Sequence, residues 1–209
     1  MKLFSYIIKS DLGFSPNPFW GACTLACCKP AIRRTAEVGD WVVGIRGKML
    51  YKKLKLPKTI DPLQKYGIIY AMRVSDKLTF DEYYVKFPEK RPDLKNAETI
   101  YRRGDNIYKP IKKGDYEQLE SQHTIKKAFE NKIKDLNGKF VLISDEFYYF
   151  GSKPIKIPPK LNILICGRGD KNKFDTSVQK SFVKYISSEK KGISAKPSLW
   201  NENDNSWRQ

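Results

Sequence analysis

Short apolar runs, separated by polar stretches rich in glycine and proline, recur along the whole chain. Runs that combine aromatic and β-branched residues with period-two alternation are typical of β-strands. They predict strands at residues 3–9, 41–46, 66–76, 139–144, 147–151 and 162–166. The glycines and prolines between the runs mark the turns at which the chain leaves each strand.

Helical spacing of apolar residues is found in fewer places. Residues 175–188 carry apolar side chains on one side and predict the best-defined helix. Residues 124–136 show the same spacing. Thr79 and Glu82 stand at capping-box spacing, which predicts that a short helix begins there. Residues 22–37 are compatible with a short helix that is interrupted by a proline.

The order of these elements predicts an α+β fold. At 209 residues the chain is long enough for one sizeable hydrophobic core, so a single domain is expected. Strands with helices inserted between them favour a strongly bent sheet or a small β-barrel with flanking helices. The domain is expected to span residues 1–192, and the polar residues 193–209 an irregular C-terminal tail. The lysine-rich residues 48–65 predict a long basic hairpin loop.

Charge points to a polyanionic partner. The chain has 40 Lys and Arg against 23 Asp and Glu, a formal net charge of +17. Each phosphate that a basic side chain neutralises releases condensed counterions, so nucleic acid is the leading candidate. The alternative is that lysine serves only solubility. No apolar run approaches the ~20 residues of a membrane-spanning helix, and no signal peptide is recognised, so a cytoplasmic protein without membrane contact is expected.

The cysteines predict neither a disulfide framework nor a metal site. Cys23, Cys27, Cys28 and Cys166 are expected to be reduced thiols in a chain of this kind. Zinc sites usually show paired Cys or His spacings, and the only histidine is His123. No cofactor is expected either, because the glycines around Arg168 lack the spacing of a nucleotide-binding fingerprint.

Residues 17–47 hold the densest mixture of chemistry-bearing side chains and predict the functional surface. Aromatic residues there can stack on a base, and amide, hydroxyl and carboxylate groups can read a base edge. The candidate base-binding residues are Asn17, Phe19, Trp20, Thr24, Trp41, Asp105, Asn106 and Tyr108. The candidate phosphate-binding residues are Lys29, Arg33, Arg34 and Arg168. The alternatives are core packing for the tryptophans, a solvated basic turn for the cations and turn chemistry for the Gly-Asp-Asn sequence.

A catalytic pair is a weaker hypothesis. Cys28 and His123 could act as nucleophile and base, oriented by Asp105. The alternative is that the cysteine is a small buried hydrophobe.

Three segments together resemble the nucleotide-modification-associated domain family of the second type. They are FSYIIKSDLGFSPNPFWGACTLACCKPAIRRTAEVGDWVVG, then IIYAMRVSDKLTFDEYY with GDNIY, then FVLISDEFYYFG with CGRGDKNKF. The resemblance implies a place in the making or handling of modified DNA bases in phages and bacteria, and hence DNA in preference to RNA. More loosely, the order of elements is similar to the EVE, YTH and ASCH modules of the PUA-like superfamily, which hold a single base in a pocket.

The preferred hypothesis is therefore a protein that binds nucleic acid, or a nucleotide with a modified base, in a pocket lined by residues 17–47. One competing hypothesis is an enzyme that acts on a modified nucleotide or DNA base. Another is a nonspecific basic protein that binds nucleic acid without a pocket.

Overall fold

The structure is a computed structural model. It describes residues 1–58, 61–112, 114–121, 123–124, 128–167 and 169–202. Unit 1 comprises Met1–Leu12, Ala36–Ser75 and Ser144–Leu199, and unit 2 comprises Gly13–Thr35, Asp76–Ile143 and the described residues from Trp200 onward. Each of these compact units closes around a hydrophobic core of its own, and the single domain expected from length stays a prediction. The domain boundary after residue 192 stays a prediction.

Unit 1 is built on a six-stranded mixed sheet with the order β10-β1-β3-β4-β9-β11. Its strands are β1 Leu3–Ile8, β3 Trp41–Arg46, β4 Gly67–Arg73, β9 Glu146–Tyr149, β10 Asp170–Lys171 and β11 Gly192–Ile193. β3 runs parallel to β1 and antiparallel to β4. The order begins and ends at different strands, so this sheet is open, and the described strands form no closed barrel.

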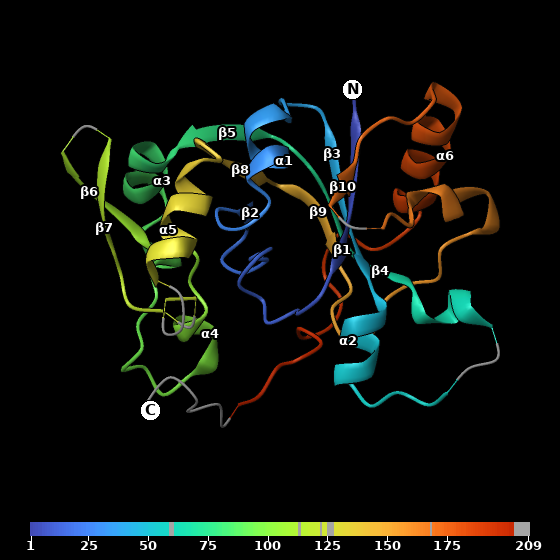
Figure 1. Ribbon diagram of the computed structural model, residues 1–209, viewed down its shortest axis with the longest axis horizontal. Coiled ribbons are helices and arrows are strands. Elements are labelled where there is room, and N and C mark those ends of the chain that lie inside the picture. Colours follow the sequence, from blue (N-terminus) through green and yellow to red (C-terminus); the bar gives the residue numbers. More distant parts are fainter. Residues whose placement is uncertain (59–60, 113, 122, 125–127, 168, 203–209) are drawn as a thin grey trace. The chain divides into compact units, whose positions relative to one another are not determined.

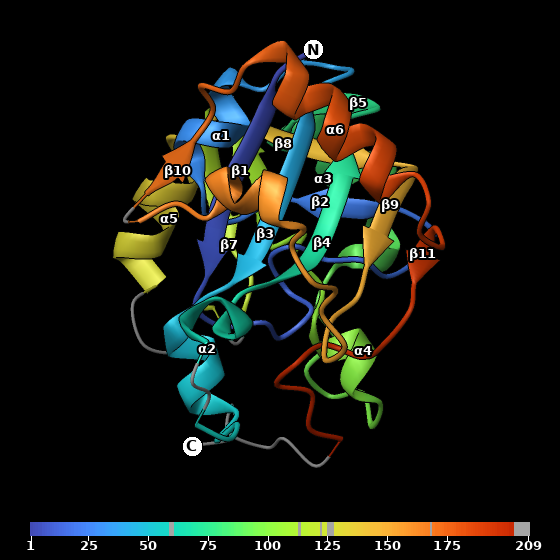
Figure 2. The same ribbon diagram turned by 90° about the vertical axis from the view of Figure 1, so that its right-hand side faces the viewer.

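The helical segments of unit 1 are α2 Lys48–Lys53, η1 Pro62–Lys65, η3 Pro159–Leu164 and α6 Thr176–Ile186. Of these, η3 and α6 contribute buried residues to its core cluster. Figure 2 shows α6 lying across one face of the sheet, where Phe182 and Ile186 join Leu3 and Val43 in one buried cluster. Burial of an apolar side chain of this size stabilises the folded state by about 1.5–3 kcal/mol.

Unit 2 combines two small sheets with short helices. Strands β2 Cys23–Leu25, β8 Phe140–Ser144 and β5 Asp76–Thr79 pair in that order, and β6 Tyr108–Lys112 pairs with β7 Asp115–Gln118. The helices are α1 Pro30–Thr35, α3 Phe80–Lys86, η2 Pro88–Lys90, α4 Thr99–Arg102 and α5 Ala128–Leu136. α3 lies beside the β6–β7 hairpin (Figure 1). The rings of Phe80 in α3 and Tyr108 in β6 meet edge to face. No described helix is long and apolar enough to cross a bilayer.

The start of α3 confirms the capping box. The Thr79 hydroxyl accepts the backbone N–H of Glu82 at 3.3 Å, and the Glu82 carboxylate accepts the backbone N–H of Thr79 at 2.8 Å. Two N–H groups that have no partner within the helix are thereby satisfied.

Two local interpretations were wrong. The first part of the helix predicted at 22–37 is instead β2, because these residues pair with β8, which lies far away in the sequence. The strand predicted at 162–166 is instead the end of η3. Its buried residues Leu161 and Leu164 stand three apart, the repeat of a 3₁₀ turn.

The two predicted inserts also differ from expectation. The basic segment 48–65 is not all loop, because it contains α2 and η1. In the segment 124–136 the helix is seen as α5, and residues 125–127 lie outside the described part. The apolar face expected for α5 is largely in solvent, since Phe129 and Ile133 are 74% and 57% exposed.

Residues after Gly192 are bound to unit 1 as far as Leu199. Ser194 N–H donates to the carbonyl oxygen of Tyr149, and Leu199 N–H to that of Asp11. The Asp11 carboxylate accepts both the N–H and the hydroxyl of Ser198, at 2.7 and 2.8 Å, and the hydroxyl of Tyr149. This part of the predicted tail is therefore ordered by specific hydrogen bonds.

Candidate functional site

Trp41 belongs to the core of unit 1. Its side chain is 2% exposed, and its ring packs on Tyr148 and Phe182 at centroid distances of 6.2 and 5.7 Å. A ring enclosed in this way offers no face to a base, so the core alternative holds for Trp41.

A buried lysine holds the loop from Asn17 to Thr24 in unit 2. The backbone N–H groups of Asn17 and Thr24 donate to each other's carbonyl oxygens at 2.9 and 2.8 Å. Inside the loop, the Lys90 ammonium donates to Oδ1 of Asn17 at 2.8 Å and to the carbonyl oxygens of Phe19 and Ala22 at 2.8 and 2.9 Å. Lys90 is fully buried, so its charge is satisfied by these oxygens.

Trp20 stands at the tip of this loop within an aromatic cluster, defined as Phe19, Trp20, Tyr101 and Trp200. The Trp20 ring lies 5.7 Å from that of Phe19 and 6.2 Å from that of Tyr101, and Phe19 lies 5.6 Å from Trp200. Trp20 is half-buried, Tyr101 is 40% exposed, and the Lys90 ammonium lies 5.6 Å from the Trp20 ring centroid. Trp20 also has φ 57°, a strained backbone for a bulky residue that costs about 1–3 kcal/mol.

The polar residues proposed to read a base edge are buried and bonded within unit 2. Asp105 accepts the hydroxyls of Thr24 at 2.8 Å and Tyr83 at 2.6 Å. Burial raises the pKa of Asp105, while the positive charge of Lys90 opposes the rise. The Asn106 amide donates to two backbone carbonyls, one of them that of Tyr83 at 3.1 Å. These side chains therefore organise the fold beneath the loop and do not present free polar groups at a surface.

The proposed phosphate ligands lie in different environments. Arg33 is fully buried and donates to backbone carbonyls, including that of Phe140 at 2.7 Å, so no phosphate reaches it. Arg34 is exposed on α1, and Lys29 is half-buried with φ 42°. Arg168 lies outside the described residues. Among the described members of the predicted set, Arg34 is therefore the most exposed, and its guanidinium donates to the carbonyl and side-chain oxygens of Asn137 at 2.9 and 3.2 Å.

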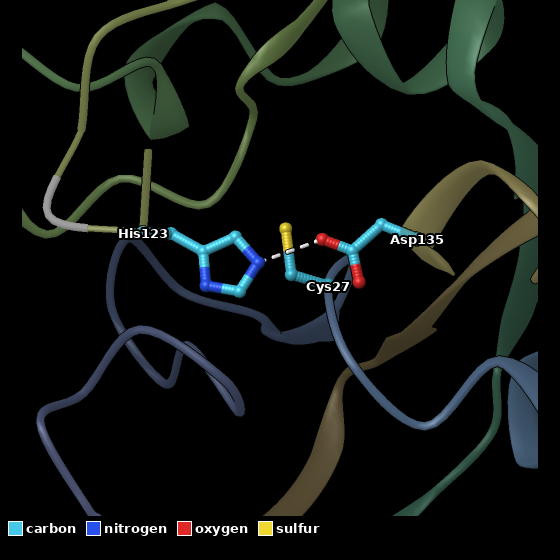
Figure 3. Close-up of side chains that lie close together, drawn as sticks. All are labelled: Cys27, His123 and Asp135. Carbon is cyan, nitrogen blue, oxygen red and sulfur yellow. Dashed lines mark hydrogen bonds and ion pairs between the residues drawn. The ribbon is translucent and has the colours of Figure 1, made fainter. Parts of the chain in front are cut away.

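A cluster of a cysteine, a histidine and an aspartate lies elsewhere in unit 2. Ligand atoms of Cys27, His123 and Asp135 all lie within 4.8 Å of one another (Figure 3). Nε2 of His123 is 2.9 Å from Oδ2 of Asp135, the oxygen that also accepts the Tyr108 hydroxyl at 2.9 Å. The backbone N–H of Cys28 donates to Oδ1 of Asp135 at 2.6 Å. The cysteine in this group is thus Cys27, where sequence reasoning proposed Cys28.

The electrostatics of this group oppose a nucleophilic cysteine. Burial, together with the carboxylates of Asp135 and Asp105, raises the pKa of the Cys27 thiol well above its ordinary value. Burial alone would raise the pKa of Asp135, but the hydrogen bond from His123 and the charge of Arg33 bring it below its usual range. The carboxylate is therefore ionised and the thiol protonated at neutral pH, whereas a nucleophilic cysteine needs a thiolate.

The family model for the nucleotide modification associated domain 2 matches residues 1–204. The chain belongs to this family. The match extends over both units and confirms the resemblance on which the sequence analysis drew, whereas the PUA-like likeness has no such support. No curated protein and no solved structure matches the chain. Its association with nucleotide modification therefore rests on the family itself.

In this nucleotide modification associated domain, sequence reasoning missed Lys90 and Asp135. Both are charged residues in a chain full of them, and no local pattern distinguishes them from surface positions. Their partners Asn17 and Cys28 lie 73 and 107 positions away. Only the tertiary structure, which brings these distant partners together, shows that each residue is buried and hydrogen-bonded.

Sequence reasoning also missed a cavity of about 590 Å³ in unit 1 of the same domain. Its lining includes Arg46, Tyr66, Ile155, Lys156 and Asn162. The volume is in the range of small-molecule sites. None of the predicted site residues lines this cavity.

Proposed function

We propose that this protein binds a nucleobase-bearing ligand, either nucleic acid or a nucleotide with a modified base, on the aromatic cluster around Trp20. The observation that carries the proposal is the half-buried Trp20 ring, held in a strained conformation by a loop fastened from within by Lys90. A fixed aromatic face binds a base by stacking, worth about 1–3 kcal/mol, with little entropy lost on binding.

Polar chemistry near the rings supports the same function. The indole Nε1 of Trp200 is buried and has no hydrogen-bond acceptor among the described residues. Trp200 packs on Phe19 within the cluster, and because this atom is buried, a ligand would supply its acceptor only by displacing the side chains that cover it. The net charge of +17 favours ligands that carry phosphates, and Arg34 is the exposed candidate to contact one.

Truncation of Trp20 tests the proposal directly. Trp20→Ala should weaken binding to the preferred base by about 1–3 kcal/mol, roughly 5- to 150-fold, with a small change in melting temperature. Binding is measured by titration against DNA and nucleotide panels with and without modified bases. Phe129→Ala is the matched control, because Phe129 is an aromatic of unit 2 that is 74% exposed outside the cluster.

The two possible roles of Trp20 give opposite results. If the ring only packs, its loss should lower the melting temperature and leave affinity unchanged, and the aromatic cluster would then not be the binding surface. Arg34→Ala separates phosphate from base contacts, because it should weaken all sequences alike.

An enzyme acting on a modified nucleotide is the second candidate, favoured by the contact between His123 and Asp135. Such a pair can hold an imidazole as a general base. Mass spectrometry of a modified nucleotide pool incubated with the protein would reveal a product, and His123→Ala should abolish its formation.

A further inference from the structure

The His123 ring, the Cys27 sulfur and the Asp135 carboxylate converge on one point in unit 2 (Figure 3). Zinc–ligand bonds of about 2.0–2.3 Å place the ligand atoms of a tetrahedral site roughly 3–4 Å apart. The three ligand atoms already lie within 4.8 Å of one another, and the nitrogen–oxygen pair is 2.9 Å apart. We propose that these residues form a three-ligand site for a divalent transition-metal ion, with Zn²⁺ as the best fit.

The surroundings hold the ligand side chains in place. Asp135 receives the Tyr108 hydroxyl on one carboxylate oxygen and the Cys28 N–H on the other. The His123 ring stacks on Phe14 at a centroid distance of 5.1 Å. Partners of this kind orient the ligands of metal sites, and little side-chain freedom remains to be lost when an ion binds.

Among the described residues, Arg33 is the cation that pairs with Asp135 besides His123, and its contacts leave the carboxylate available. Its guanidinium donates to the backbone carbonyls of Cys28, Phe140 and Asp135. The distance from Nη2 to Oδ1 of Asp135 is 3.9 Å, a loose ion pair. A Zn²⁺ ion with one thiolate and one carboxylate forms a neutral unit, so Arg33 can keep its carbonyl partners beside an occupied site.

The donor set selects the class of ion. One sulfur, one imidazole nitrogen and one carboxylate oxygen suit a borderline-soft ion such as Zn²⁺, whereas Mg²⁺ and Ca²⁺ prefer oxygen alone. Three protein ligands leave a fourth position, which zinc sites of this kind fill with water or a substrate atom. Spacing in the sequence concealed the site because the cysteine and the histidine are 96 positions apart, from 27 to 123.

Cobalt titration of the metal-free full-length chain tests the proposal, since Co²⁺ in place of Zn²⁺ reports a sulfur ligand through a thiolate-to-metal charge-transfer band. One Co²⁺ per chain is expected, with this band present and abolished by excess Zn²⁺. Cys27→Ser should remove the band, and Cys166→Ser should keep it. His123→Ala should weaken binding at least tenfold, and this partly exposed position keeps the test decisive should Cys27→Ser fail to fold.

Two outcomes overturn the site: wild-type protein without the band, or a band that persists in Cys27→Ser or in His123→Ala at unchanged affinity. Trp20→Ala should leave the band unchanged, so failure of the metal site and failure of the nucleobase surface are distinguishable.

Discussion

Lys90 is the single residue on which the shape of the proposed binding loop most depends. Its ammonium satisfies the side-chain oxygen of Asn17 and the carbonyls of Phe19 and Ala22 in a buried site. Lys90→Met keeps the length of the side chain but removes the donor to the Phe19 and Ala22 carbonyls, whereas Oδ1 of Asn17 keeps the N–H of Phe19 at 3.2 Å. Each unsatisfied buried acceptor costs about 1–3 kcal/mol, so the free energy of unfolding should fall by at least about 2 kcal/mol.

Urea unfolding of Lys90→Met beside Lys86→Met measures this effect. Lys86 lies in α3 with 58% of its side chain exposed and pairs with Asp76 at 3.5 Å. An exposed pair of this kind contributes about 0–1 kcal/mol. Equal losses in the two variants would show that Lys90 does not hold the loop.

The residues of the candidate site could be predicted only in part. Trp20 was singled out because aromatic residues, glycine and basic residues crowd one stretch, and its role in binding stays a prediction. Asn17 and Asp105 were correctly associated with the same region, but their hydrogen bonds to Arg103 and Tyr83 make them internal supports. Composition cannot separate a polar residue that faces a ligand from one that faces the fold.

At the scale of elements, the start of α3 offers a clean test of local design. Thr79→Ala removes the hydroxyl of the capping box and should lower the free energy of unfolding by about 1 kcal/mol. Asp175→Ala at the start of α6 is the control, because the Asp175 side chain makes no capping hydrogen bond. Asp175→Ala should lower the free energy of unfolding by less than Thr79→Ala in the same urea titration. A larger decrease for Asp175→Ala would contradict the role of the capping box.

The capping box at the start of α3 also makes the stability of the folded state depend on pH, and the sign of this dependence is known. Hydrogen bonds from the backbone and hydroxyl of Thr79 lower the pKa of Glu82 below its ordinary value of 4.5. The stabilisation that ionised Glu82 gives the folded state is fully present above pH 4.5 and is lost as the pH falls through the lower pKa of Glu82 in the folded state. Thr79→Ala should reduce this acid-side loss.

Elements were predictable where the pattern is local and failed where tertiary contacts decide. β1 and β3 are found where their aromatic and β-branched residues predicted strands, and both are buried on both faces, whereas α6 follows its periodicity because one side of it is buried. The helix predicted at 124–136 is confirmed as α5 in its described residues, but its buried face was not predictable, because Asp135 is 1% exposed while Phe129 stays in solvent. Apolar periodicity located this helix and could not show that its inward face is organised around a carboxylate.

For the whole molecule, charge makes the broadest prediction. DNA affinity should fall with salt, with a log–log slope of about −0.9 for each phosphate neutralised. If the exposed Lys52, Lys53 and Lys55 contact phosphates, replacing all three with Gln should weaken binding to every sequence and make the slope shallower.

The matched control replaces Lys173, Lys180 and Lys184 with Gln. These lysines are exposed on unit 1, and their replacement removes the same charge. Equal effects of the two triple variants would indicate a diffuse field with no defined contact surface. A slope near zero in the wild-type protein would remove the electrostatic basis for nucleic-acid binding altogether.

Asp11 joins positions near opposite ends of the chain, since its bond to Ser198 spans 187 residues. Asp11 therefore closes a very long loop by noncovalent contacts. The entropic cost of closing a loop grows slowly, by about 0.6 kcal/mol for each doubling of length, so closing this loop costs little more free energy than closing a much shorter one. Loss of the carboxylate would remove two hydrogen bonds of Ser198, while the backbone hydrogen bonds from Ser194 to Tyr149 and from Ser152 to Lys196 would remain. One carboxylate near the N-terminal end of unit 1 therefore shares with backbone hydrogen bonds the attachment of its C-terminal segment.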